Sequence, residues 1–401
     1  MPTIDSLIPE SGVRDTAALL AVAPDALADY VVDVRNAWWR RRICVQALAG
    51  RVPEARIPAL LDRVRDSEDT GEVRIALLDL LCDRAELLPW LREEERSRES
   101  GYRMPGTLLR TRGLLGDRTA ARALATLAFS LWRHEQQLGE DGLMALVERY
   151  GPEAVLAELD EDRPEDRAFA VWMRYREGGD VTPYLADPDR GVAHTAHELA
   201  TDQDGLRACL AEDPATEAAV WAVLALHRIT EDAEETRLLD ARLGHPRVEV
   251  PGLDEELRRA IVHEYVAGCA RASDPRWRLE ALCTEPPVRP DTADQTARAA
   301  AAVAAAGLAP KPPVSCWEHE KQGDGTYYVI ECDGQEVLVS TLGRFVMSHA
   351  HAHAARPHLE DAGFRWIDQE TADTEVTDLD VYYFGTRRPR DVDTLLFYWQ
   401  D

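Results

Sequence analysis

Hydrophobic residues recur at helical spacing along most of the chain, and the stretch from Val181 to Asp232 shows this pattern best. It contains two similar units, each with a short apolar segment, an Asp-Pro turn and a longer helix. In the first unit four residues fall on one helix face, namely Val192, Thr195, Ala196 and Leu199. In the second, residues 220–229 are apolar nearly all round, which is typical of a helix covered on two sides. We therefore predict successive pairs of helices here.

The same spacing predicts further helices on both sides of this stretch. Two helices are expected within residues 13–50, and others at 57–64, 72–82, 119–137, 142–150, 154–159, 165–175, 234–243 and 254–272. A final weak pair reaches residue 306. The units lie roughly 25 to 50 residues apart, which favours an irregular array over a regular repeat.

The pattern changes at Pro310, where the segment Lys311-Pro312-Pro313 reads as a linker. Residues 326–331 and 336–340 alternate around an Asp-Gly step, which predicts a β-hairpin. Further strands are expected at 344–347, 364–367, 381–385 and 394–399, and a short helix at 356–362. We predict two domains, a helical one at 1–309 and a small α+β domain with an antiparallel sheet at 310–401.

Paired helices with a Pro-marked turn and small residues in the second helix resemble the HEAT repeat and its shorter bilin-lyase-type relatives. The resemblance covers roughly residues 13–309 and implies an irregular α-α superhelix, or solenoid. It implies a curved binding surface as well. The C-terminal domain resembles no family that we recognise.

The net charge of −27 argues against general binding to nucleic acid, which needs clustered Lys and Arg. No run approaches the roughly 18 apolar residues of a membrane span, and the first residues carry no secretory signal. The seven cysteines are widely spaced and form no CxxC pair, as expected of reduced thiols. We therefore expect a cytoplasmic protein without a membrane partner. The Arg- and Ala-rich composition suggests a bacterial source.

Four His-Glu dipeptides form the first candidate site: His134-Glu135, His197-Glu198, His263-Glu264 and His319-Glu320. Imidazole and carboxylate together suit iron or zinc held between helices. Such pairs on successive repeats resemble deoxyhypusine hydroxylase, which implies a metal-dependent oxidative enzyme. The alternative is that these pairs are exposed or capping groups without a metal.

A histidine-rich segment is the second candidate site. His349, His351 and His353 would share one face of a strand and could bind zinc or nickel there. On a helix only His349 and His353 would lie one turn apart, and a solvated loop would bind nothing.

The third candidate is a series of Trp and Arg residues on the expected helices. Its members are Trp38, Trp39, Arg42, Trp132, Arg133, Trp172, Arg174 and Trp221. HEAT-like DNA glycosylases are similar in residue classes, because their grooves use Arg for phosphate and Trp for stacking. The alternative is that these residues fill the core or anchor a protein partner.

No nucleotide-binding glycine motif or nucleophile elbow occurs in a fitting context, so we assign no catalytic residue and no cofactor. The hypothesis that follows is a non-enzymatic scaffold with an acidic, curved surface. Its partner would be a protein or peptide with a basic or aromatic segment. The metal-dependent enzyme and the DNA glycosylase are the alternatives.

Overall fold

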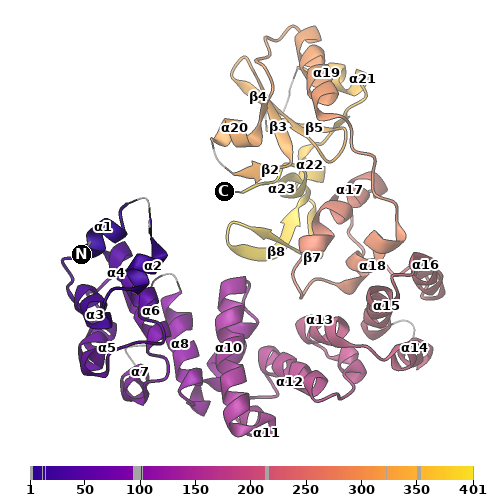
Figure 1. Ribbon diagram of the computed structural model, residues 1–401. Helices are drawn as coiled ribbons and strands as arrows, with labels where there is room; N and C mark the ends of the chain where they lie inside the picture. Colours follow the sequence, from indigo (N-terminus) through magenta and orange to yellow (C-terminus); the bar gives the residue numbers. More distant parts are fainter. Residues whose placement is uncertain are drawn as a thin grey trace. The chain divides into compact units, whose positions relative to one another are not determined.

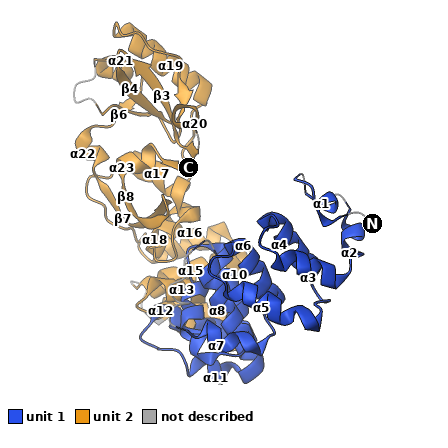
Figure 2. Ribbon diagram, turned by 90° about the vertical axis from the view of Figure 1, so that its left-hand side faces the viewer, with its two compact units in different colours: residues 1–173 blue, residues 174–401 orange. Residues whose placement is uncertain are grey.

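A computed structural model describes residues 3–10, 12–13, 15–93, 101, 103–212, 216–321, 323–349 and 354–400. Contacts divide the chain into two compact units, residues 1–173 and 174–401, which Figure 2 shows in different colours. The described part is mainly helical, with strands near the C-terminus (Figure 1). This confirms the prediction of a mainly α chain with a region of sheet at the end. None of the described helices is long and apolar enough to cross a bilayer.

Unit 1 is helical throughout its described part. Its α-helices are α1 (Ile4–Leu7), α2 (Thr16–Leu20), α3 (Pro24–Val32), α4 (Trp38–Ala47), α5 (Ile57–Arg65), α6 (Gly71–Leu80), α7 (Leu88–Leu91), α8 (Met104–Leu114), α9 (Ala121–Ala128), α10 (Arg133–Tyr150), α11 (Pro152–Leu156) and α12 (Pro164–Arg176), whose last turn belongs to unit 2. Short 3₁₀ turns precede α5, α7 and α9, namely η1 (Glu54–Arg56), η2 (Ala85–Leu87) and η4 (Arg118–Ala120).

Helix pairs α3–α4 and α5–α6 pack within unit 1, and α4, α6, α8 and α10 contact one another in succession. Two buried arginines recur at the same place in the first two pairs. The Nε atom of Arg41 donates to the carbonyl of Val31, and that of Arg74 to the carbonyl of Val64, each ten residues earlier. Arg41 also binds buried Asp69 through both terminal nitrogens, at 2.7 and 2.6 Å. The second arginine thus repeats the first in the next helix pair.

Unit 2 begins with helices and ends with strands. Its helical elements are η5 (Thr182–Ala186), α13 (Arg190–Leu199), α14 (Gln203–Glu212), α15 (Glu217–Thr230), α16 (Ala233–Arg242), α17 (Glu255–Tyr265), η6 (Val266–Gly268), α18 (Pro275–Cys283), α19 (Thr292–Ala305), α20 (Cys316–Glu320), α21 (Arg356–Asp361), α22 (Gln369–Ala372) and α23 (Val392–Leu396). Arg258 on α17 donates to the carbonyl of Val248, again ten residues earlier. Residues 219–226 of α15 are all buried, as its apolar pattern predicts.

The strands form one five-stranded sheet and two separate two-stranded pairs. The large sheet has the order β1 (Val314–Ser315), β3 (Tyr327–Cys332), β4 (Gln335–Ser340), β5 (Phe345–Met347) and β6 (Arg365–Trp366). Its neighbours are antiparallel except β5 and β6, which are parallel and joined through α21. The pairs are β2 (Asp324–Gly325) with β9 (Trp399–Gln400), and β7 (Glu375–Tyr383) with β8 (Thr386–Asp391). The hairpin expected at the Asp-Gly step is β3–β4, whose turn residues Asp333 and Gly334 have φ of 48° and 82°.

Both faces of the large sheet are buried away from the hairpin end of β3 and β4, because side chains alternate between two cores. One face packs against α19 and α21 through Ile330, Val337, Val339 and Val346. The other joins α17, α18 and β7 through Val329, Leu338, Phe345 and Met347. Backbone hydrogen bonds also connect β7 to the segment before α18. The N–H groups of Ala270 and Asp274 donate to the backbone carbonyls of Asp380 and Asp378, respectively. The core of unit 2 is therefore continuous across Pro310, where the sequence changes character.

One strand expected from the sequence is wrong. Residues 394–399 alternate in a way that suggested a strand, but residues 392–396 form helix α23. The carboxylate of Asp391 accepts a hydrogen bond from the backbone N–H of Thr394 and caps the helix. Val392, Leu395 and Leu396 are buried at helical spacing. A short strand, β9, follows the helix.

Candidate functional site

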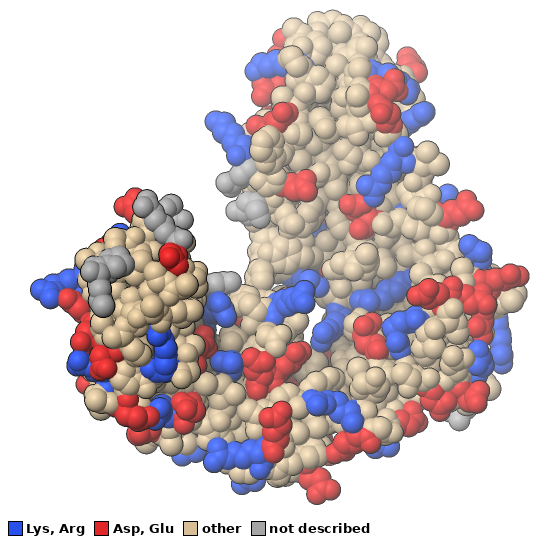
Figure 3. All heavy atoms as spheres, in the orientation of Figure 1, with Lys and Arg blue, Asp and Glu red and all other residues tan. Residues whose placement is uncertain are grey.

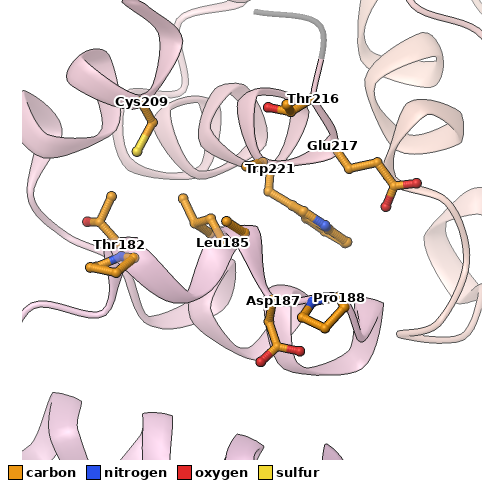
Figure 4. A pocket seen from close by; sticks show the side chains of 11 residues that line it. Thr182, Leu185, Asp187, Pro188, Cys209, Thr216, Glu217 and Trp221 are labelled. Carbon is orange, nitrogen blue, oxygen red and sulfur yellow. The ribbon is translucent and has the colours of Figure 1, made fainter. Parts of the chain in front are cut away.

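A cavity of about 620 Å³ lies in unit 2, within the stretch that the hydrophobic pattern singled out (Figure 4). We call it the Trp221 pocket. Its walls come from η5, the turn before α13, α14 and the first turns of α15. The lining residues are Thr182, Pro183, Leu185, Ala186, Asp187, Pro188, Cys209, Thr216, Glu217, Ala218 and Trp221. In Figure 4 the indole of Trp221 lies between Glu217 and Pro188, at the acidic end of the cavity.

Local hydrogen bonds hold the wall between η5 and α13. The carboxylate of Asp187 accepts from the backbone N–H of Asp189 at 2.9 Å. Asp189 in turn caps α13 by accepting from the N–H groups of Gly191 and Val192. The buried side chain of Leu185 anchors η5 beneath the pocket. The Asp-Pro turn of the sequence is thus a fixed part of the wall.

The opposite wall is the N-terminus of α15. Thr216 occupies the N-cap position but makes no capping hydrogen bond from its side chain. Glu217 and Ala218 form the first turn, and Trp221 follows one turn later. Trp221 is 1% exposed, yet its Nε1 has no hydrogen-bond partner among the described residues, and neither has Oγ1 of buried Thr182. Buried polar groups are nearly always paired, so two unpaired groups in the walls of one pocket are unusual.

The rim of the pocket is acidic. Arg190 donates to both oxygens of Glu217, and its other contacts are Asp274 at 2.7 Å and Asp378 at 2.8 Å. These carboxylates, Glu217 first, raise the pKa of the Arg190 guanidinium. Arg276 also binds Asp274. Glu217 and Asp187 are thus the two carboxylates that line the pocket, and Asp274 and Asp378 share Arg190 with Glu217.

Behind the pocket, His194 and His197 on α13 pack against the Trp221 ring, with ring centroids 5.5 and 5.3 Å from it. Glu198 completes what we call the buried cluster: His194, His197 and Glu198. Its Oε1 lies 3.3 Å from Nδ1 of His197 and 4.0 Å from Nε2 of His194. The ligand atoms of the three residues all lie within 4.8 Å of one another. Two imidazoles and a carboxylate are ligands that zinc or iron accepts.

The charges around the buried cluster oppose a cation. Arg278 donates to Nε2 of His194 at 3.0 Å, so that nitrogen must be an acceptor and the ring neutral. Burial, followed by Arg278, lowers the pKa of His194 to about 3. Contact with His197 lowers the pKa of Glu198 to about 2, and Arg228 adds to this effect. A metal ion at His194 would have to displace the hydrogen bond from Arg278. It would also be repelled by the positive charges of Arg278 and Arg228.

Two of the other predicted His-Glu pairs make local contacts instead. In unit 1, Glu135 binds the hydroxyl of Ser130, next to His134. In unit 2, Nε2 of His263 lies 3.0 Å from Oγ1 of Thr284, and Glu264 forms an ion pair with Arg289. Neither pair belongs to a group of three metal-binding side chains among the described residues.

The histidine-rich segment lies mostly outside the described residues. His351 and His353 fall there, so the expected zinc or nickel face has no structural description. His349 is at the edge of the described part.

The Trp and Arg series divides between surface and core. In unit 1, Trp38 and Trp132 are each 43% exposed, and Arg133 beside Trp132 is exposed too. Arg42 lies 5.9 Å from the ring centroid of Trp38, and neighbouring Trp39 is half-buried under Arg40. Trp172 packs on Phe169, with ring centroids 5.7 Å apart.

In unit 2, Arg174 donates to the carbonyl of Asp180, and Trp221 lies in the core beside the pocket.

The structure thus brings together His197, Glu198 and Trp221, which came from two separate sequence patterns. Sequence reasoning missed His194, although it lies three and four residues before His197 and Glu198 on the same helix face. It also missed Arg278, for which the sequence carries no signal.

Comparison with models of known protein families, with curated proteins and with solved structures finds no match for this chain.

Proposed function

We propose that the chain is a non-enzymatic binding protein, and that the Trp221 pocket takes a basic side chain of a protein or peptide partner. The observation that carries this proposal is an apolar cavity with an acidic rim. Pockets of this size, apolar with a few placed polar groups, are typical of ligand sites. The lining residues include a thiol, two carboxylates and an indole, but no histidine to pair with a nucleophile. This favours binding over catalysis.

The expected partner chemistry follows from the charges of the rim. A lysine or arginine side chain could enter along the apolar wall formed by Leu185, Ala186 and Pro188, and place its charge near Glu217 and Asp187. The face shown in Figure 3 mixes acidic and basic side chains, so no extended field of one sign appears there. Recognition would therefore depend on the local carboxylates rather than on the net charge of −27.

We also propose that the helical part is a HEAT-like array, in which the pocket lies between two successive helix pairs. Support comes from Arg41 and Arg74, which bind the carbonyl ten residues earlier in two successive helix pairs, and from Arg258, which binds the carbonyl of Val248 in the segment before its own helix. A cytoplasmic location is part of the proposal, and the seven free cysteines support it.

The hydroxylase-like enzyme and the DNA glycosylase stay alternatives from the sequence. The position of Arg278 beside His194 argues against the hydroxylase-like enzyme.

A selection from a random peptide library on the full chain tests the proposal. The blocking variant is Ala186→Trp, because Ala186 is exposed and lines the pocket. Ala304→Trp, at an exposed alanine of α19, is the matched control. We expect peptides with a Lys or Arg beside apolar residues to bind the wild type and the control, and to lose at least about tenfold in affinity on the blocked variant. Peptides that bind all three proteins equally would contradict the proposal.

A charge variant separates the rim from the cavity. Glu217→Gln keeps the size of the side chain and removes one carboxylate of the rim. We expect affinity for the basic peptides to fall and its dependence on salt to weaken. Unchanged affinity would show that the carboxylate of Glu217 does not contribute to recognition of the partner's charge.

A further inference from the structure

A second group of histidine and carboxylates lies on the large sheet of unit 2. It consists of His319 on α20, Glu331 on β3 and Glu336 on β4, and we call it the surface cluster. Helix α20 is held in place by a capping box, in which Ser315 and Glu318 each accept a hydrogen bond from the other's backbone. Buried Cys316 anchors its first turn. His319 is thereby placed beside the end of the β3–β4 hairpin.

The hairpin puts two like charges opposite each other. Glu331 and Glu336 are direct partners in the antiparallel register, next to the Asp333-Gly334 turn. Directly opposed like charges destabilise a sheet, so a positive group near both glutamates would stabilise the hairpin. His319 faces both carboxylates, with Nδ1 at 3.9 Å from Glu331 and Nε2 at 3.6 Å from Glu336.

The ligand atoms of the surface cluster are available. Lys311 binds Oε2 of Glu331, whereas Oε1 faces His319. Glu320, the other half of the His-Glu dipeptide, lies 4.0 Å from Nε2 of His319. Three carboxylates therefore lie around the imidazole of His319, and Lys311 binds one of them. The arrangement is the reverse of the buried cluster, where guanidinium groups face the imidazoles.

We propose that the surface cluster binds a zinc ion through His319, Glu331 and Glu336. One imidazole nitrogen and two carboxylate oxygens are common zinc ligands, and a three-residue set leaves a position for water or for Glu320. The chosen ligand atoms lie within 4.8 Å of one another. A tetrahedral zinc site needs separations of roughly 3.3 Å, so small side-chain rotations would complete the site. The ion would also neutralise the opposed glutamates.

Zinc binding by the full chain tests this inference. The chelator-treated protein is titrated with zinc against a fluorescent competitor, and bound zinc is counted by mass spectrometry after gel filtration. The variants are His319→Asn and Glu336→Gln, both conservative in size and close to the surface. His358→Asn, at an exposed histidine of α21, is the control. Circular dichroism establishes that each variant is folded.

The expected result is that the wild type and His358→Asn bind one more zinc equivalent than either cluster variant. An equal number of zinc ions in wild type and His319→Asn would overturn the inference, as would a wild type that binds no zinc. None of these results depends on the Trp221 pocket.

Discussion

The buried cluster and the surface cluster of unit 2 contain the same kinds of ligand but differ in burial and in neighbouring charge. His194 and His197 are 8% and 6% exposed, and they lie between Trp221 and arginines. His319 lies near solvent among glutamates. Ligand type and spacing alone would treat the two as equal metal candidates. We therefore expect the surrounding charges to decide which of the two clusters binds a cation.

The two clusters should differ most in how much the neighbouring tryptophan contributes to the free energy of unfolding. Trp221→Ala should lower the free energy of unfolding by about 3–5 kcal/mol, because it removes a buried ring that covers both histidines. Trp317→Ala is the matched change beside the surface cluster, since Trp317 is 54% exposed. We expect it to cost no more than about 0.5 kcal/mol. Denaturant unfolding measures both free energies. Similar losses in the two variants would contradict the stated difference between the two clusters.

Arg278 is expected to contribute both stability and selectivity. Arg278→Met removes the donor to His194 and to the carbonyl of Ala270, which should cost about 1.5–3 kcal/mol. It also removes the charge that opposes a cation, so the buried cluster should gain affinity for zinc. Zinc titration of Arg278→Met in a His319→Asn background isolates that gain. If no zinc binds there, charge is not what excludes the metal.

Acid should destabilise the buried cluster in particular. The pKa of His194 is about 3 in the folded chain, against 6.5 for a free histidine. The unfolded chain therefore takes up the proton first, and stability present above pH 6.5 is lost as the pH falls toward 3. Between pH 7 and 5 the loss should be about 2 kcal/mol. His194→Asn should remove this part of the pH dependence. An unchanged profile in that variant would contradict the role given to His194.

The smallest effect concerns the opposed glutamates. In the absence of zinc, Glu336→Gln removes the like-charge pair and should raise Tm slightly. With zinc present, the same substitution should lower Tm relative to the wild type, because a ligand is lost. Thermal unfolding with chelator and with zinc measures both values. The same sign under both conditions would argue against a bound ion.

Some of this could be predicted from the sequence. The apolar spacing in residues 220–229 predicts a covered helix, and the Asp333-Gly334 step predicts the hairpin. The register of that hairpin would also have placed Glu331 opposite Glu336. The spacing within α13 would have added His194 to His197 and Glu198. These features depend on local geometry, which sequence patterns record.

The remaining features depend on contacts between distant residues. Arg278 lies 84 positions after His194, and no pattern connects them. The placement of His319 over the hairpin depends on how a five-residue helix packs on the sheet. The Trp221 pocket likewise depends on the packing of η5 against α15. Hence the types of residue could be predicted, but not the charges that surround them.

The most direct test of the proposed function is to map where a selected basic peptide binds. The peptide would carry a photoreactive group next to its lysine, and mass spectrometry would locate the cross-links on the full chain. We predict adducts within residues 182–188, at Cys209 and within residues 216–221, which disappear in Ala186→Trp. Adducts elsewhere on the chain, or the same adducts in the blocked variant, would contradict the account.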